Sequence, residues 1–250
     1  PTVQRDPRTH PPDRSQGAEE AQAPEPEPQA TEFLGSVRVG QPEGTRGSLK
    51  WIQRAVERAP VALTVPILGP VTWLSPLRDD GFAEYRDVSF LSRLGLDHLG
   101  PALEDFWPRR GPQWDALGRA DTRVVLVEAK ARLAEFATPA TQASATSRVK
   151  IEAAFAQVKK ALGVAAHNDW TKDYYQYANR IAHLWWLRGN GVDAHLLFVD
   201  FLNDADVGGP SKIEAWTEAY AVAEARLGIA SHHPLTPYMH HVYPDTTLLR

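Results

Sequence analysis

Apolar residues gather in several segments of this chain, and two of these segments have the character of buried strands. Residues 124–127 form an unbroken run of valine and leucine, and residues 194–202 form a longer apolar run. Both have the length and the β-branched or aromatic content of strands inside a sheet. Two further segments, 61–68 and 71–77, are apolar but interrupted by prolines. At least one of them is expected to be a strand, because proline is tolerated at the ends and edges of sheets.

Helical spacing of apolar residues is visible in the first half of the chain. It predicts a first helix over 48–59, with Ser48 as its N-cap and Pro60 just after its end. Residues 82–94 are expected to form a second helix. The segment 103–110 is short, and its pattern does not decide between helix and loop.

Three longer helices are expected in the second half. The first carries apolar residues at helical spacing, namely Ile151, Phe155, Val158 and Leu162. The second spans about 171–188 and is rich in aromatic residues, which we expect to pack in the core rather than to stack on bases. The third spans 211–227 and ends at Gly228. Strands that alternate with helices predict an α/β protein with a central mixed β-sheet flanked by α-helices.

Composition separates the N-terminal residues from the rest. Residues 1–32 are rich in proline and glutamate, contain no aromatic residue and carry three arginines against seven acidic residues. Such a segment cannot bury enough surface to offset its ordering entropy, so we expect a disordered tail. The formal charge of the whole chain is −4, which leaves residues 33–250, the expected single domain, close to neutral. Positive charge for a nucleic acid is therefore expected only locally, at a cleft.

The absence of cysteine excludes disulfides and thiolate metal sites, and it fits a reducing compartment. No apolar stretch is long enough to span a membrane, and the N-terminal residues lack the features of a signal peptide. We therefore expect a cytoplasmic protein that has no membrane partner.

Two carboxylates and a lysine carry the most informative chemistry. Asp115 precedes a short apolar segment, and Glu128 and Lys130 follow the apolar run 124–127. The polar break at 118–122 contains glycine and aspartate and is expected to be the turn of a hairpin. Side chains alternate along a strand, so Glu128 and Lys130 point to the same face. A hairpin would bring Asp115 close to both.

Metal-assisted phosphodiester cleavage requires this combination of groups. Asp115 and Glu128 offer oxygen ligands for Mg²⁺ or Mn²⁺, and the backbone carbonyl of Ala129 offers a third. Lys130 would orient or activate the attacking water, or offset charge in the transition state. The same residues could form an ordinary solvated strand end or an ion pair, but the strand context favours the catalytic interpretation.

The sequence Trp114–Asp115, followed by Val127–Glu128–Ala129–Lys130, resembles the PD-(D/E)xK nuclease superfamily, whose fold is called restriction-endonuclease-like. The wider run from Gly111 resembles uncharacterised bacterial members of that superfamily. The resemblance covers the chain from about Ser48 to its end, and it implies that Asp115, Glu128 and Lys130 are catalytic residues on adjacent strands. Trp114 stands where the family pattern has a proline that is not a ligand. The short motif indicates a superfamily rather than a substrate.

The resemblance also implies a third acidic residue, contributed by the helix that opens the domain. Glu57 is the candidate by position, and Glu84 is its competitor. Either residue could instead pair with a neighbouring arginine.

Polar residues after the motif are candidates for substrate binding. Gln157 lies off the apolar face of its helix, and Gln176, Arg180 and His183 form a stripe on the next helix. The stripe either faces a cleft, where Arg180 would hold a phosphate, or forms the solvated side of the helix, which we favour slightly. The hydroxyl-rich loop 132–144 either contacts substrate or simply connects surface elements.

Other site types find little support. The pairs His232–His233 and His240–His241 suggest zinc, but adjacent histidines rarely bind one ion together, so we do not expect a zinc site. Asn203, Asp204 and Asp206 lack EF-hand spacing and are expected to form a polar turn. Motifs of P-loop NTPases, acyl hydrolases and dinucleotide-binding proteins are absent from the sequence.

The sequence therefore predicts a Mg²⁺-dependent nuclease, with DNA as the favoured substrate and a homodimer as a further hypothesis by family analogy. The alternative is a catalytically idle fold that binds nucleic acid or protein. The near-neutral body favours this alternative slightly, whereas the intact set of Asp115, Glu128 and Lys130 disfavours it. A third hypothesis is an enzyme that acts on a phosphate ester outside nucleic acids.

Overall fold

The computed structural model describes residues 37–249, so the tail predicted over residues 1–32 lies outside the described residues. At the centre is a hairpin of β4 (Ala116–Ala120) and β5 (Arg123–Lys130). The turn contains only Asp121 and Thr122, and Asp121 has a φ of +57°, which aspartate tolerates better than most residues. The turn predicted over 118–122 was therefore too long, because its first three residues continue β4. The first of these three residues is Gly118. A Cβ added there would lie 2.6 Å from the side chain of Val71, which explains why this position is a glycine.

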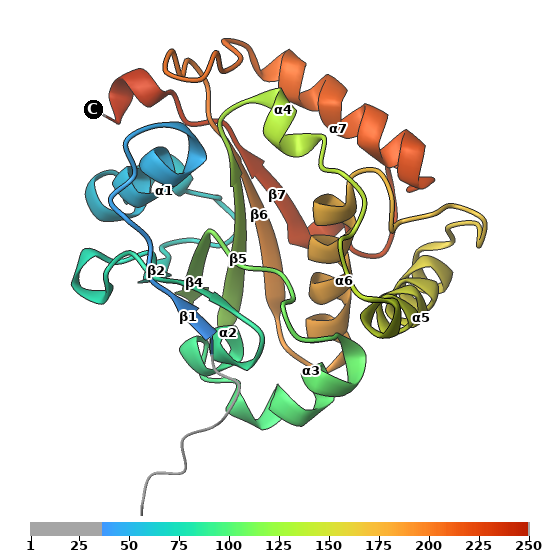
Figure 1. Ribbon diagram of the computed structural model, residues 1–250. Helices are drawn as coiled ribbons and strands as arrows, with labels where there is room; N and C mark the ends of the chain where they lie inside the picture. Colours follow the sequence, from blue (N-terminus) through green and yellow to red (C-terminus); the bar gives the residue numbers. More distant parts are fainter. Residues whose placement is uncertain (1–36, 250) are drawn as a thin grey trace, which may run out of the picture. The chain divides into compact units, whose positions relative to one another are not determined.

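Between residues 37 and 249, five strands form one mixed sheet in the order β2, β4, β5, β6 and β7 (Figure 1). Its remaining members are β2 (Thr72–Ser75), β6 (Ala194–Asp200) and β7 (Met239–Val242). The pairs β2–β4 and β4–β5 are antiparallel, whereas β5–β6 and β6–β7 are parallel. A separate antiparallel pair consists of β1 (Val37–Val39) and β3 (Glu84–Arg86). The predicted α/β class with a central mixed sheet is confirmed.

The described residues contain seven α-helices: α1 (Gly47–Arg58), α2 (Val88–Arg93), α3 (Gly100–Phe106), α4 (Leu133–Phe136), α5 (Ala145–Leu162), α6 (Tyr175–Gly189) and α7 (Ile213–Leu227). Short 3₁₀ helices occur at Pro60–Leu63, Arg78–Asp80, Asp97–Leu99, Thr236–Tyr238 and Thr246–Leu248. No helix in this part of the chain combines the length and the hydrophobicity that a membrane crossing requires.

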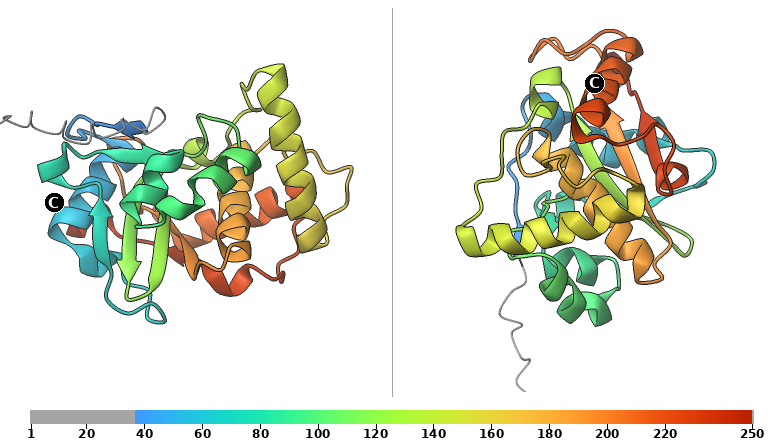
Figure 2. Two further views of the ribbon diagram at one scale, coloured as in Figure 1. Left: turned by 90° about the horizontal axis from the view of Figure 1, so that it is seen from below. Right: turned by 90° about the vertical axis from the view of Figure 1, so that its right-hand side faces the viewer.

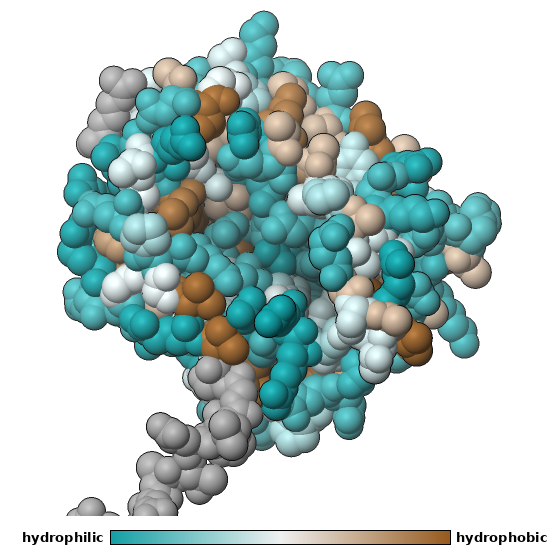
Figure 3. All heavy atoms as spheres, viewed as in Figure 1, coloured by the Kyte–Doolittle hydropathy of each residue, from teal (hydrophilic) through white to brown (hydrophobic). Residues whose placement is uncertain are grey.

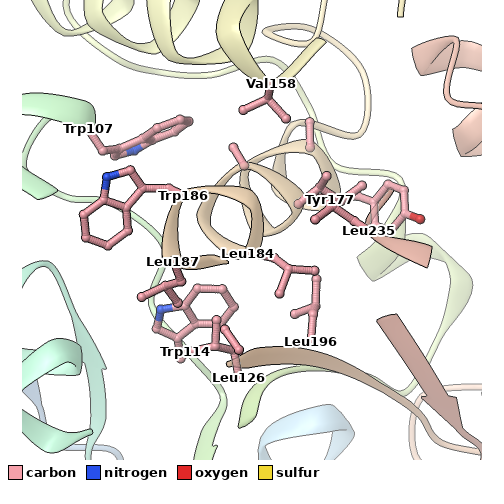
Figure 4. Packing of buried hydrophobic residues seen from close by; sticks show 14 of the residues in the cluster. Trp107, Trp114, Leu126, Val158, Tyr177, Leu184, Trp186, Leu187, Leu196 and Leu235 are labelled. Atoms are coloured by element: carbon pink, nitrogen blue, oxygen red, sulfur yellow. The ribbon is translucent and has the colours of Figure 1, made fainter. Parts of the chain in front are cut away.

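Helices cover both faces of the main sheet. α6 and α7 lie on one face and α1 lies on the other, while α5 packs outside α6 (Figures 1 and 2). Along β5, Val124 and Leu126 enter the core below α6, which also contains Trp114 (Figure 4), whereas Val125 and Val127 enter the core below α1. A register slip of one residue would exchange these faces. The two cores therefore determine the face on which Glu128 and Lys130 lie.

Two local predictions were wrong. α1 begins at Gly47 with Arg46 at the N-cap position, so Ser48 lies inside the helix rather than capping it. The helix expected over 82–94 is interrupted, because β3 occupies its first part and α2 its second. Phe82 and Asp87 have φ values of +48° and +52°, which no α-helix accommodates. Pairing of β3 with the distant β1 outweighs the local helical spacing.

Candidate active site

The β4–β5 hairpin brings the three motif residues to one end of the sheet. Asp115 directly precedes β4, and Glu128 and Lys130 end β5. The Asp115 carboxylate accepts a hydrogen bond from the backbone N–H of Ala129 at 2.7 Å. This N–H is free to bond a side chain because β4 begins only at Ala116. The structure therefore places Asp115, Glu128 and Lys130 next to one another, on the face of the sheet that α6 covers.

Glu128 is held between two cations. Lys130 Nζ donates to its Oε1, and Arg180 Nε donates to its Oε2 at 2.5 Å. Lys130 Nζ also donates to Oε1 of Gln176, at 3.1 Å. Glu128, Lys130 and Arg180 are 4%, 8% and 2% exposed, so this is a buried charge cluster rather than a surface ion pair. Buried charges are tolerated only when they are paired and hydrogen-bonded, as these are.

These contacts determine which groups are charged. Burial alone would raise the pKa of Glu128, but the charges of Arg180 and Lys130 outweigh it and lower that pKa. Burial would lower the pKa of Lys130, but Glu128 and Asp115 reverse the effect and raise it. Glu128 is therefore ionised and Lys130 is an ammonium at neutral pH. In this state Lys130 is a hydrogen-bond donor and not a general base.

Glu84, on β3, adds a third carboxylate. It accepts hydrogen bonds from the side-chain amides of Gln113 and Gln41, the latter at 3.0 Å. Burial raises the pKa of Glu84, and the charge of Glu128 adds to the rise. Burial also raises the pKa of Asp115 well above its usual range, with further contributions from the charges of Glu128 and Glu84. Three carboxylates thus repel one another here, and Asp115 is the one that gains a proton most easily.

Of the two candidates for a third acid, only Glu84 lies at this site. Glu57 is exposed on α1, and its carboxylate accepts the backbone N–H of Arg78 at 2.8 Å. The placement of Glu57 at the site was therefore wrong. Glu57 was favoured by its position in the sequence. Glu84 reaches the site because the N–H of Trp114 donates to the carbonyl of Tyr85 at 3.1 Å, which attaches β3 to the segment just before β4.

Each of the three guanidinium nitrogens of Arg180 donates a hydrogen bond within the protein. Besides Glu128, it donates to the side chain of Asn179 at 2.9 Å and to the carbonyl of Gln113 at 2.7 Å. Its guanidinium carbon lies 4.8 Å from the ring centre of Trp114. The expectation that this stripe forms the solvated side of the helix was wrong. With these donors engaged, Arg180 orients Glu128 rather than reaching out to a phosphate.

An open cleft of about 430 Å³ lies directly above these residues. Ten of its fourteen lining residues have polar side chains, namely Glu84, Gln113, Asp115, Thr138, Thr141, Gln142, Tyr175, Gln176, Asn179 and Arg180, and the other four are Gly111, Pro112, Pro139 and Ala140. Figure 3 shows a hydrophilic hollow near the centre of this face. Glu128 and Lys130 lie one layer below the cleft and reach its lining through Arg180 and Gln176.

The loop predicted over 132–144 borders this cleft after a short first part that forms α4. It is tied to the start of α6, because the N–H of Gln176 donates to Oγ1 of Thr138 at 3.1 Å and the N–H of Tyr174 donates to the Thr138 carbonyl at 3.1 Å. Of its two predicted roles, the structure places the loop where it can contact a substrate.

Gln157 and His183 lie elsewhere. Gln157 is exposed on α5 and is not among the residues that line the cleft, so the structure does not bring it to the motif residues. His183 is 1% exposed and packs against the rings of Phe106, Trp107 and Trp114. His183 is buried because the aromatic residues at the end of α3 cover it, which helical spacing does not reveal.

Gln113 and Gln41 are site residues that the sequence analysis missed. Gln113 lies two residues before Asp115, so the alternation of side chains along an extended segment was a usable signal for it. Gln41 reaches Glu84 only through the pairing of β1 with β3, for which the sequence offers no comparable signal.

A divalent ion is compatible with the donor set. Within residues 37–249, no three histidine, cysteine, aspartate or glutamate side chains form a ready metal site, and the histidine pairs form none either. Mg²⁺ does not need such a cage, since proteins bind it through one or two carboxylates together with substrate phosphates and water. Burial, together with the charges of Glu128 and Glu84, raises the pKa of Asp115, and a cation would relieve the repulsion among these carboxylates. Asp115 and the Ala129 carbonyl offer oxygen atoms to such an ion, whereas both carboxylate oxygens of Glu128 are already bonded to Lys130 and Arg180.

Comparison with family models, with curated proteins and with solved structures gave no match for this chain. A function is therefore inferred from the residues of the site and their chemistry.

Proposed function

We propose that this protein is a Mg²⁺-dependent nuclease of the PD-(D/E)xK type that hydrolyses phosphodiester bonds, with DNA as the favoured substrate. One observation carries the proposal: Asp115, Glu128 and Lys130 meet at the ends of two adjacent strands below an open, polar cleft. A cleft lined by amides and hydroxyls can bind sugar and phosphate oxygens, and the acidic group below it can bind the ion that phosphodiester cleavage uses.

The residues would divide the reaction between them. Asp115, Glu128 and the Ala129 carbonyl would hold Mg²⁺, which when bound polarises the phosphate and lowers the pKa of water. The ammonium of Lys130 would donate a hydrogen bond to the attacking water or to a phosphate oxygen, which favours the more negative transition state. Gln176 accepts from Lys130 and keeps its own amide N–H groups for the substrate. Arg180 keeps Glu128 ionised and oriented.

A cleavage assay tests this proposal. Single-stranded, duplex and branched DNA and RNA would be incubated with the protein and Mg²⁺ or Mn²⁺, with EDTA as the metal-free control. We expect metal-dependent cleavage that falls by about 10²- to 10⁴-fold in Asp115→Asn and in Lys130→Gln. Lys160→Gln, at an exposed lysine on α5, is the matched control and should cleave like the unmodified protein. Thermal unfolding of each variant would show that it is folded.

The second candidate, a catalytically idle fold that binds nucleic acid or protein, also has a supporting observation. Both carboxylate oxygens of Glu128 already have cationic partners, so the cluster is satisfied without a metal. Under this hypothesis the unmodified protein would cleave none of the substrates and would bind neither Mg²⁺ nor Mn²⁺ in calorimetry. Cleavage of a small phosphodiester but of no nucleic acid would instead favour the third hypothesis.

A further inference from the structure

The outer side of α1 carries a regular series of cations that the proposed chemistry does not use. Arg46, Lys50, Arg54 and Arg58 recur every four residues, and we call them the α1 ridge. Four residues rise about 6 Å along a helix, so the ridge extends roughly 18 Å. Its side chains lie beside the buried face of α1, which contains Trp51, Ile52, Ala55 and Val56.

The cations of the ridge are largely unneutralised. Among the described residues, Arg46, Arg54 and Arg58 have no ion pair with a carboxylate, whereas Lys50 pairs with Asp206 at 2.6 Å. Arg54 and Lys50 rest on the ring of Trp51, with 5.2 and 4.2 Å to its centre. This contact positions Arg54 without cancelling its charge, whereas the charge of Lys50 is compensated by Asp206 and its side chain is only 13% exposed.

A fifth cation and two further carboxylates complete the surroundings. Arg78 lies beside the ridge and pairs with Glu43 at 3.1 Å, while Glu57 accepts the backbone N–H of Arg78. Five cations thus face three carboxylates, counting Asp206, which leaves a net charge of +2 on a body that is near neutral. The Arg78–Glu43 pair is 50% and 61% exposed, so a competing anion displaces it at little cost.

Folding does not account for a cation at the start of α1. The first turn of α1 contains no acidic residue, and the N-cap position has no side-chain hydrogen bond. Cations at a helix N-terminus oppose the helix dipole. Arg46 therefore opposes the stability of the helix that it precedes, whereas Lys50 is compensated by Asp206 and by the ring of Trp51. A cation that opposes the helix dipole in this way is expected where the surface serves binding.

The ridge begins near the end of β5 that carries the motif residues, on the opposite face of the sheet from α6. Gln41 donates to Glu84 in the cleft wall, and the residues after it lead into α1, where the N–H of Gly44 donates to Oε1 of Gln53 at 2.8 Å. At the first turn of α1, a Cβ on Gly47 would lie 3.6 Å from Glu135, just beyond the end of β5. Figure 1 shows α1 next to this end of β5, across the sheet from α6.

From these observations we infer that the α1 ridge binds the phosphate backbone of nucleic acid that extends out of the cleft. A line of cations with few paired carboxylates fits a polyanion with regularly spaced charges, and such contacts are independent of base sequence. The choice of nucleic acid as the polyanion rests on the proposed function. The binding itself requires no metal and no cleavage.

The test measures binding in EDTA, where cleavage does not interfere. Fluorescence anisotropy would follow a labelled DNA duplex and its single strand with the full chain, from about 50 to 200 mM NaCl. The variant Arg46→Gln/Arg54→Gln/Arg58→Gln removes the unpaired cations. We expect its affinity for duplex to fall on the order of 100-fold at about 0.1 M salt, and its salt slope to fall by about 2 to 3. The matched control is Lys160→Gln/Lys172→Gln/Arg226→Gln, three exposed cations around α5 and α7.

Each outcome decides the inference. A loss of affinity and slope in the ridge variant alone supports it, even if the protein cleaves nothing, in which case only the proposed function fails. Equal binding by the ridge variant and the unmodified chain overturns it, even if cleavage is observed. An equal loss in both triple variants, or no DNA binding by the unmodified chain, also overturns it.

Discussion

The two faces of β5 differ sharply, although they belong to the same strand. On the α1 face, Val127 and Ala129 continue an apolar core. On the α6 face, Glu128 and Lys130 are buried as charges, with Arg180 above them. Taking such ions out of water costs several kcal/mol each, and their mutual attraction recovers only part of that cost. The apolar residues on the α1 face are those that stability alone would favour at this end of β5. The buried charges on the α6 face are not favoured by stability, so they require a functional explanation.

The largest effect should come from breaking the charge cluster on one side only. Arg180→Ala leaves Glu128 with Lys130 as its only charged partner and removes the contacts to Asn179 and Gln113. We expect a loss of about 3–5 kcal/mol in the free energy of unfolding, because a buried carboxylate loses half of its compensation. Urea denaturation followed by circular dichroism measures it.

Removing all the charges together sharpens the comparison. In the variant Glu128→Leu/Lys130→Met/Arg180→Met the α6 face resembles the α1 face, and we expect its stability to equal or exceed that of the unmodified protein while cleavage is abolished. If this variant were several kcal/mol less stable, the cluster would be a structural element, and the distinction between the two faces would fail.

The pH dependence of stability should also come from the α6 side. Burial, with a smaller contribution from Arg180, lowers the pKa of His183 from 6.5 to about 3. The folded state therefore keeps His183 neutral while the unfolded chain protonates it. His183 therefore leaves the free energy of unfolding unchanged above pH 6.5 and lowers it as pH falls from 6.5 toward 3, by up to about 1.4 kcal/mol per pH unit. In His183→Leu, denaturation midpoints between pH 6.5 and 4 should fall less steeply; an unchanged slope would contradict the assignment.

How far the sequence leads can be judged from particular residues. β5 and β6 were predictable because each contains a short apolar run, with three valines in β5 and with phenylalanine and valine in β6, and the alternation of Glu128 and Lys130 followed from strand geometry. β3 was not predictable, because its three residues pair with β1 more than forty positions away. Glu84 reaches the cleft only through that pairing. The burial of Arg180 was hidden for a similar reason, since periodicity reveals which residues share a face and not what covers it.

The smallest effect is expected at Glu57, whose charge lies at the surface of α1 and outside the cleft. Glu57→Gln keeps an acceptor for the N–H of Arg78, so the free energy of unfolding should change by no more than about 0.5 kcal/mol.

The kcat of Glu57→Gln for DNA cleavage should be unchanged, whereas Glu84→Gln should lower kcat because it alters the charge that Asp115 and Glu128 experience. Because Glu57 adjoins the α1 ridge, removing its charge should tighten DNA binding slightly. A fall in kcat for Glu57→Gln as large as that for Glu84→Gln would mean that both sides of the sheet contribute to the chemistry.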